Sequence, residues 1–263
     1  MKKIFLILGL MLLALPVLCL ADTTVLPVSF TPASVNEQGN IQAVALWQTS
    51  SKQTHLFLPS DWDASQLRIW YSGEGKLTVA GQAVNSGDIV SGFTSGASVK
   101  VKYGTKSCTV QVHQSANVAT VYMTTESGSL TSIHASKANR EKGTILITDA
   151  DGQEICRQEL TQVKCRGNTS FKKPAKKSYQ FKLTEKQNLF GHGKSKTWLL
   201  ITGYRDRSFL RNVIASDLAN YVGLQYTPGY TFCDLYINGE YRGFYLLAEK
   251  VEIGSKRINI TDL

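Results

Sequence analysis

The chain has few of the side chains that build metal centres, and they are not suitably spaced. Its 263 residues include only 5 cysteines and 4 histidines. The cysteines lack the close paired spacing of a zinc site, and the histidines are scattered. We therefore predict no metal site in this chain, and we expect structural or surface roles for the histidines, which are His55, His113, His134 and His192.

Long apolar segments are also scarce, and the one clear example stands at the amino terminus. It runs from Ile4 to Leu15, follows two lysines and is interrupted by Pro16. With Cys19-Leu20-Ala21 behind it, this pattern is typical of a secretory signal peptide at residues 1–21, cleaved after Ala21. We expect no transmembrane span after cleavage, because no second stretch is long and apolar enough.

This leader predicts an exported protein, whether secreted, periplasmic or at the cell surface. Lipidation at Cys19 is not expected, because Leu18 is larger than the small residue that usually precedes a lipidated cysteine. Four cysteines remain after cleavage, and in an oxidising compartment they permit three full pairings. Buried free thiols are the interpretation that we favour for these residues, which are Cys108, Cys156, Cys165 and Cys233.

Charge is unevenly distributed along the chain. The formal net charge is +9, with 8 Lys+Arg against 6 Asp+Glu in residues 1–115 and 21 against 14 in residues 116–263. A basic half is typical of proteins that meet nucleic acid, anionic surfaces or phosphorylated ligands. Export argues against nucleic acid, so we expect no nucleic-acid partner.

Residues 22–115 have the pattern of an all-β module. Short alternating apolar runs are separated by turn signals at regular intervals, which suits a small β-sandwich. The composition weakly resembles the immunoglobulin-like or cadherin-like modules that precede enzymes in exported bacterial proteins. We expect Trp47 and Trp70 to belong to its core rather than to a ligand platform.

Residues 116–263 combine strands with one convincing helix. Apolar residues at helical spacing predict a helix over 206–222, ended by Gly223. Asn238-Gly239 predicts a hairpin between strands at 232–237 and 241–247, because a type I′ turn needs positive φ at both central positions. No internal repeat or low-complexity linker is visible.

A basic turn within this half is the strongest chemical signal. Arg166 and Asn168 flank Gly167, and a strand led by Lys176 and Lys177 follows. A guanidinium fork, compact ammonium charges and a close backbone approach together suit a polyphosphate. The alternative is a hairpin whose basic face is merely solvated, since lysines commonly protect sheet edges.

Taken together, residues 117–263 resemble the CotH kinase family, which is named for a spore coat protein. The matching motifs, in chain order, are Cys165-Arg166-Gly167-Asn168-Thr169-Ser170, Lys176-Lys177-Ser178-Tyr179, Lys196-Thr197-Trp198-Leu199-Leu200, Asp206-Arg207-Ser208-Phe209-Leu210-Arg211-Asn212, and the segment from Asp234 to Lys250.

The resemblance implies an atypical protein kinase that uses ATP with Mg or Mn and acts on Ser or Thr hydroxyls of a protein substrate. It implies an α+β fold, in which the β-sandwich precedes a kinase-like amino-terminal lobe, a twisted antiparallel sheet with one packed helix. Lys177 would hold the nucleotide phosphates, with Lys176 as the alternative, because neighbouring strand residues face opposite sides. Arg166 and Asn168 would form the phosphate-facing turn.

Two acids receive roles by the same analogy. The helix would brace the phosphate-binding lysine with Asp217 as its candidate acid, although Arg211 and Asn212 match the family better than any acid does. Glu249 would stand where kinases place the hinge that faces adenine. The alternative for Glu249 is a surface carboxylate paired with Lys250 or Arg242.

One part of the family pattern is missing. The resemblance implies a second lobe with metal-binding aspartates in a Trp-Asp-x-Asp segment, and no such segment occurs in residues 117–263. We therefore name no catalytic residue, and we expect a domain truncated before this lobe and inactive alone unless a complementary polypeptide supplies it. The alternative function is a non-catalytic, secreted surface or adhesion module.

Overall fold

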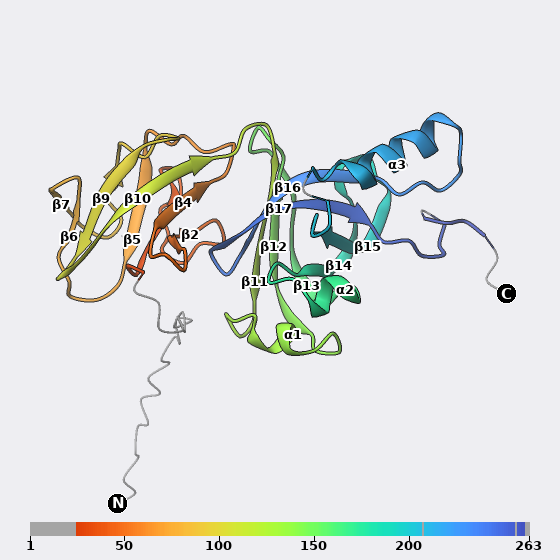
Figure 1. The fold of residues 1–263 in the computed structure, drawn as a ribbon, viewed down its shortest axis with the longest axis horizontal. Helices are drawn as coiled ribbons and strands as arrows, with labels where there is room; N and C mark the ends of the chain where they lie inside the picture. Colours follow the sequence, from red (N-terminus) through yellow and green to blue (C-terminus); the bar gives the residue numbers. More distant parts are fainter. Residues whose placement is uncertain (1–24, 207, 256, 261–263) are drawn as a thin grey trace, which may run out of the picture.

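The computed structural model describes residues 25–206, 208–255 and 257–260, and strands dominate both halves of the chain (Figure 1). The expected leader and its cleavage site after Ala21 lie outside these residues. Among the described residues, no helix combines the length and the apolar character needed to cross a membrane.

The first half folds into two sheets that enclose one apolar core. One sheet has the order β2-β1-β5-β8, formed by Val44–Ala45, Val28–Pro32, Leu67–Tyr71 and Ile89–Val90. The other has the order β3-β4-β10-β9-β6-β7, formed by Trp47–Gln48, Thr54–Leu58, Lys106–Gln114, Ser98–Tyr103, Leu77–Val79 and Gln82–Val84.

The two tryptophans of this half have different environments. Trp70 is buried and donates from Nε1 to Thr31 Oγ1 at 2.9 Å, so its assignment to the core is confirmed. Trp47 is 43% exposed, and its assignment to the core is wrong. It lies on a two-residue edge strand and pairs with His55, whose side chain points away from the core because neighbours on a strand alternate between faces.

The second half is a closed barrel of seven strands. Their order is β11-β12-β13-β14-β15-β17-β16, with bounds Ala119–Thr125, Glu141–Thr148, Glu154–Arg166, Ser178–Asn188, Lys194–Ile201, Glu240–Glu249 and Tyr230–Ile237. Apart from β11 and β16, which run parallel and close the ring, neighbouring strands are antiparallel. Large apolar side chains fill the interior, among them Phe181, Trp198 and Tyr245.

This barrel corrects the predicted fold class. An α+β arrangement with a kinase-like amino-terminal lobe is wrong, because the pairing of β11 with β16 closes the sheet that was expected to stay open. Two further short helices, α1 (Thr131–Ala135) and α2 (Thr169–Lys172), follow β11 and β13. The two hairpin strands were predicted close to their observed bounds, but the closure of the barrel depends on a pair of strands separated by more than a hundred residues.

The predicted helix exists as α3 (Leu210–Tyr221), but it does not pack on the sheet. None of its residues is buried, and Ile214 and Leu218 are more than half exposed. Figure 1 shows α3 standing outside the barrel. A helix in this position does not brace a strand-borne lysine in the way that the kinase analogy requires.

The two halves share buried contacts. Tyr122 and Tyr236, on the outer surface of the barrel, belong to the apolar core of the first half. Trp62 Nε1 donates to the hydroxyl of Tyr122 at 3.0 Å, and the hydroxyl of Tyr236 donates to the carbonyl oxygen of Phe57 at 3.0 Å. The division of the chain between residues 115 and 116 stays a prediction.

The four described cysteines are free thiols, as favoured from the sequence. Three of them (Cys156, Cys165 and Cys233) are buried. Burial raises the pKa of Cys156 and of Cys165 to about 11, so neither is a reactive thiolate at neutral pH.

Candidate functional site

The basic turn lies at one end of the barrel, which we call the helix end because α1 and α2 lie there too (Figure 1). Arg166 ends β13 and pairs with Ser178 at the start of β14, so the chain must reverse between them. Gly167 opens the reversal at φ +92, where an added Cβ would lie 2.0 Å from Ser170 Oγ. Only glycine fits this position without rearrangement.

Lys176 reaches from this turn across to β17. Its Nζ donates to the carbonyl oxygen of Phe244 at 2.5 Å and lies 4.5 Å from the ring centroid of Tyr245. The ring of Phe209 lies on another side, at 5.2 Å. Burial lowers the pKa of Lys176 to about 8, while the negative charge of Asp234 acts in the opposite direction.

Lys177 points to different partners from its neighbour. Its Nζ donates to the carbonyl oxygen of Phe171 at 2.6 Å and lies 5.4 Å from the ring of the same residue. Its own carbonyl oxygen accepts from the hydroxyl of Tyr245 at 2.8 Å. The two lysines therefore serve separate environments, but both precede the first residue of β14 and do not lie on the strand as expected, so strand alternation is not the cause.

Asn168 binds a cation that the sequence did not point to. Its Oδ1 accepts from Nζ of Lys137 at 2.7 Å, and Lys137 comes from the loop after α1. The two residues stand 31 positions apart, and Lys137 belongs to no motif. Only the fold brings them together.

Arg242 and His134 also lie at the helix end of the barrel, and we call the surface there the mouth. His134 Nε2 lies 2.9 Å from the hydroxyl of Tyr179, whose ring belongs to the apolar interior of the barrel. Burial lowers the pKa of His134 to about 4, and the positive charges of Arg242 and Lys177 act in the same direction. The sequence motifs include Arg242 but gave no sign of a role for His134.

The mouth is therefore strongly cationic. Arg242 forms an ion pair with Glu240 at 3.0 Å. In the part of the chain that the structure describes, Lys137, Arg166 and Lys177 have no carboxylate within ion-pair distance. Burial lowers the pKa of the Arg166 guanidinium from its ordinary value, but arginine remains charged in proteins. Such a cluster favours an anion.

A cavity of about 240 Å³ adjoins this end, between the last residues of β15 and the start of α3. Phe209, which contacts Lys176, forms one wall, and Arg205 and Arg211 also line the cavity. Asp206 already accepts from the backbone N–H of Arg211 at 2.8 Å, so this carboxylate supports the helix start. The cavity gives an anion a concave place beside the enclosed lysine.

The acid that faces Lys176 is Asp234, not Asp217. Asp217 lies on exposed α3 and accepts from the hydroxyl of Tyr230 at 2.6 Å. Asp234 is buried, accepts from the hydroxyl of Tyr241 at 2.8 Å, and has its pKa raised by burial. Only the start of α3, at Phe209, reaches Lys176, and the candidate acid Asp217 lies further along the helix and is bonded to Tyr230.

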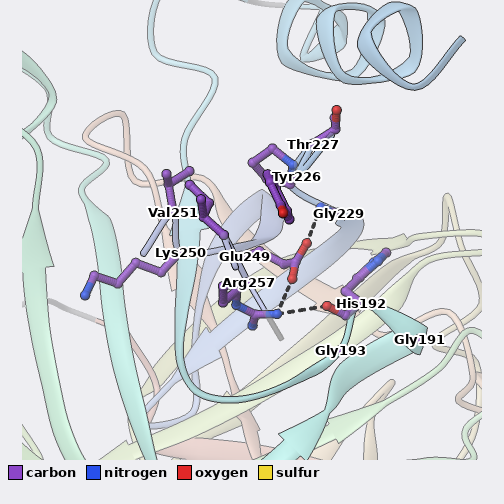
Figure 2. Close-up of a pocket in the computed structure, with 12 residues that line it drawn as sticks. Gly191, His192, Gly193, Tyr226, Thr227, Gly229, Glu249, Lys250, Val251 and Arg257 are labelled. Carbon is purple, nitrogen blue, oxygen red and sulfur yellow. Dashed lines mark hydrogen bonds and ion pairs between the residues drawn. The ribbon is translucent and has the colours of Figure 1, made fainter. Parts of the chain in front are cut away.

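Glu249 lies at the opposite end of the barrel, beside a cavity of about 410 Å³ (Figure 2). Its Oε1 forms an ion pair with Arg257, and its Oε2 accepts from the backbone N–H of Gly229 at 2.5 Å. The guanidinium of Arg257 also donates to the carbonyl oxygen of His192 at 2.9 Å. Both oxygens of Glu249 are thus engaged.

The partners suggested for Glu249 from the sequence bind elsewhere. Lys250 pairs with Glu252 at 2.8 Å and points away from the Glu249–Arg257 pair in Figure 2. Arg242 pairs with Glu240 at the helix end. The structure therefore separates Glu249 from Arg166, Asn168, Lys176 and Lys177, which stay together.

No group of three or more His, Cys, Asp or Glu side chains that could hold a metal ion occurs within residues 25–206, 208–255 and 257–260. We accordingly assign no metal ligand to these residues.

Comparison with known proteins bears on the second half of the chain. The family model described as CotH kinase protein matches residues 163–262. The resemblance to the CotH family is thereby confirmed for this segment, which includes the basic turn and Lys176. That the chain corresponds only to the amino-terminal part of the family stays a prediction. No curated protein matches the chain.

Proposed function

We propose that this chain is an exported, CotH-like protein that binds the phosphate groups of ATP at the helix end of its barrel. The observation that carries the proposal is that Lys137, Arg166 and Lys177 all lie at the helix end of the barrel, and that none of them has a carboxylate within ion-pair distance among the described residues. The family match over residues 163–262 supports the same assignment.

The residues present suit a polyphosphate in their chemistry. Arg166 offers a planar fork of donors, while Lys177 and Lys137 offer compact charges, and three such groups can neutralise several phosphate oxygens. Asn168 positions Lys137 through its side-chain oxygen. Lys176 lies beside the cavity that Arg205 and Arg211 line, and it would add a further positive charge.

ATP, when bound, would supply the phosphoryl group for transfer to a Ser or Thr hydroxyl of a protein substrate. Phosphoryl transfer depends mainly on positioning and on neutralising charge, and cations of this kind do both. Mg or Mn would be needed as well. Because we assign no metal ligand here, we propose that carboxylates outside the described residues hold the metal, and that the chain alone is inactive.

Glu249 does not fit the proposed site. It lies at the other barrel end, and both of its carboxylate oxygens are already engaged. We therefore leave it out of the nucleotide site and treat it as a structural residue.

Calorimetric titration with ATP and Mg or Mn tests the proposal. We expect Arg166→Ala together with Lys177→Ala to weaken ATP at least about tenfold, because two charge-assisted contacts are lost. The matched control is Lys182→Ala with Lys186→Ala, which removes the same charge from exposed positions of β14. Inorganic tripolyphosphate should show the same difference, and adenosine should show none.

Equal ATP affinity of the two double variants would overturn the phosphate site. The expectation that the chain alone is inactive has a separate readout, the transfer of label from γ-labelled ATP to an acceptor protein. Transfer by the isolated chain would contradict that expectation while leaving the phosphate site intact.

A further inference from the structure

The outer face of the six-stranded sheet carries a row of aromatic rings. Trp47 on β3, His55 and Phe57 on β4, and His113 on β10 all point away from the core. Tyr241 of the barrel hairpin extends the row, since its ring stacks on Phe57 with centroids 4.5 Å apart. The row therefore begins on an edge strand and ends at the contact between the two halves.

These rings contact one another, with short distances between their centroids. His113 stacks on Phe57 at 4.8 Å and on His55 at 5.1 Å, and Trp47 lies 5.7 Å from His55. The two histidines are also linked, with His55 Nδ1 lying 2.9 Å from His113 Nε2. Neighbouring rings hold each ring in place, so that the exposed ring of Trp47 has a fixed orientation.

Polar and cationic groups continue the same face beyond the rings. Ser98 Oγ donates to the side-chain oxygen of Gln111 at 2.9 Å, beside the aromatic row. Lys100 and Lys102 follow on β9, both exposed and on the same side as Ser98. The six strands of the sheet contain no Asp or Glu. The face is therefore apolar at one end, hydrogen-bonding in the middle and positive at the other end.

We propose that this face binds an acidic polysaccharide, a polymer of uronic acids. The C–H face of a pyranose ring is apolar and can lie flat on an aromatic ring, while its hydroxyls exchange hydrogen bonds with amide and hydroxyl groups. Lys100 and Lys102 complement the carboxylates, and no acidic side chain of the sheet opposes them. Exposed apolar patches with a polar surround are typical of binding sites.

The open shape of the face favours a polymer over a small ligand. Neither cavity described above includes a residue of this sheet. Lys100 and Lys102 pair with Thr109 and Ser107, several residues along β10 from His113. At about 3.3 Å per residue, the face spans more than one sugar unit.

Single-stranded nucleic acid is the competing polymer, and the face suits it less well. Its binding sites combine stacking rings with a positive groove that follows the backbone at every nucleotide. Here the two lysines stand together at one end, away from the rings. Each uronate unit carries an apolar ring face as well as a carboxylate, so such a polymer can lie on the rings at one end of the face and pair with Lys100 and Lys102 at the other.

Affinity electrophoresis of the leader-free chain through gels containing polygalacturonate tests the inference. We expect retardation that weakens about tenfold on Trp47→Ala, because one stacking surface is removed. Trp47→Phe should retain most of the binding. Lys100→Gln with Lys102→Gln should weaken it at low salt but not at high salt. Lys182→Gln with Lys186→Gln, on β14 of the barrel, should leave it unchanged.

Four further outcomes decide between alternatives. Methyl-esterified polygalacturonate should bind more weakly than the free acid, because it has the same rings without the charge. Binding of single-stranded poly(dT) as tight as that of the uronate would overturn the proposal, and so would equal retardation of Trp47→Ala and the parent chain. The Arg166→Ala, Lys177→Ala variant should bind the polymer normally, which separates this inference from the phosphate site.

Discussion

The side chain of Lys176 occupies the space that a side chain at Gly243 would need. A Cβ added at Gly243 would lie 2.9 Å from Nζ of Lys176 and 3.2 Å from its Cε. The lysine side chain can therefore pass over β17 here only because residue 243 has no side chain. The bulge between Leu235 and Tyr236 in the pairing of β16 with β17 lies at this point. The glycine within the family motif thus has a local reason, which is to admit the ammonium group.

We predict that Gly243→Ala destabilises the protein by about 1–3 kcal/mol and displaces the Lys176 side chain. The cost combines the positive φ of +103 with the short contact. The matched control is Gly81→Ala, where φ is +87 but nothing lies within 4 Å of the new Cβ, so only the backbone cost remains. Urea denaturation of both variants measures the difference, and equal losses would contradict the steric part.

We predict that Asp234→Asn lowers the pKa of Lys176 below its value of about 8. Burial already disfavours the charged ammonium, and the negative charge of Asp234 is what opposes burial. NMR titration of the lysine side chain measures the shift. Asp217→Asn on exposed α3 is the control and should leave the titration unchanged. A Lys176 titration unaffected by either change would show that Asp234 does not act on it.

The sequence predicted the last hairpin of the barrel because its signal is local. Residues 232–237 and 241–247 flank the turn pair Asn238-Gly239, and the structure has strands at Tyr230–Ile237 and Glu240–Glu249. The closure of the barrel could not be found in this way. It depends on Ala119 pairing with Cys233, and loop length alone does not favour one such distant pair over another.

The candidate site shows the same division between local and distant information. Arg166, Lys176 and Lys177 were found because they share one turn, and the structure keeps them at one barrel end. Lys137 was missed because an isolated lysine carries no pattern. Glu249 was included because kinase strand order was assumed, and the barrel places the end of β17 at the opposite side.

We predict that the stability of the protein falls as the pH drops from about 6.5 towards 4, in part because of His134. Its pKa is about 4 in the folded chain and about 6.5 when unfolded. Between these values the unfolded chain binds a proton that the folded chain does not, so acid favours unfolding. The full shift corresponds to about 3 kcal/mol at most.

His134→Gln should flatten this dependence, since the glutamine does not titrate. Denaturation at several pH values between 4 and 7 checks the slope. A phosphate ligand at the mouth should raise the pKa of His134, because it offsets the positive charges of Arg242 and Lys177. An NMR titration of His134 that is the same with and without tripolyphosphate would argue against an anion at this mouth.

We predict that Glu249→Ala destabilises the chain by about 3–5 kcal/mol and leaves ATP affinity unchanged. The carboxylate and Arg257 form a buried ion pair, with side chains 12% and 6% exposed, and removing one partner leaves the other charge buried. Lys250→Ala is the control. Its pair with Glu252 is more exposed, and such pairs contribute about 0–1 kcal/mol.

The paired replacement Glu249→Leu with Arg257→Met separates charge from packing at this end of the barrel. It removes both charges, so we expect it to restore most of the stability lost in Glu249→Ala. The Arg257 guanidinium also lies 4.7 Å from the Trp198 ring, and the methionine keeps an apolar contact there. A Glu249→Ala variant that is fully stable but loses ATP would instead place the nucleotide at the cavity of about 410 Å³ and remove it from the helix end.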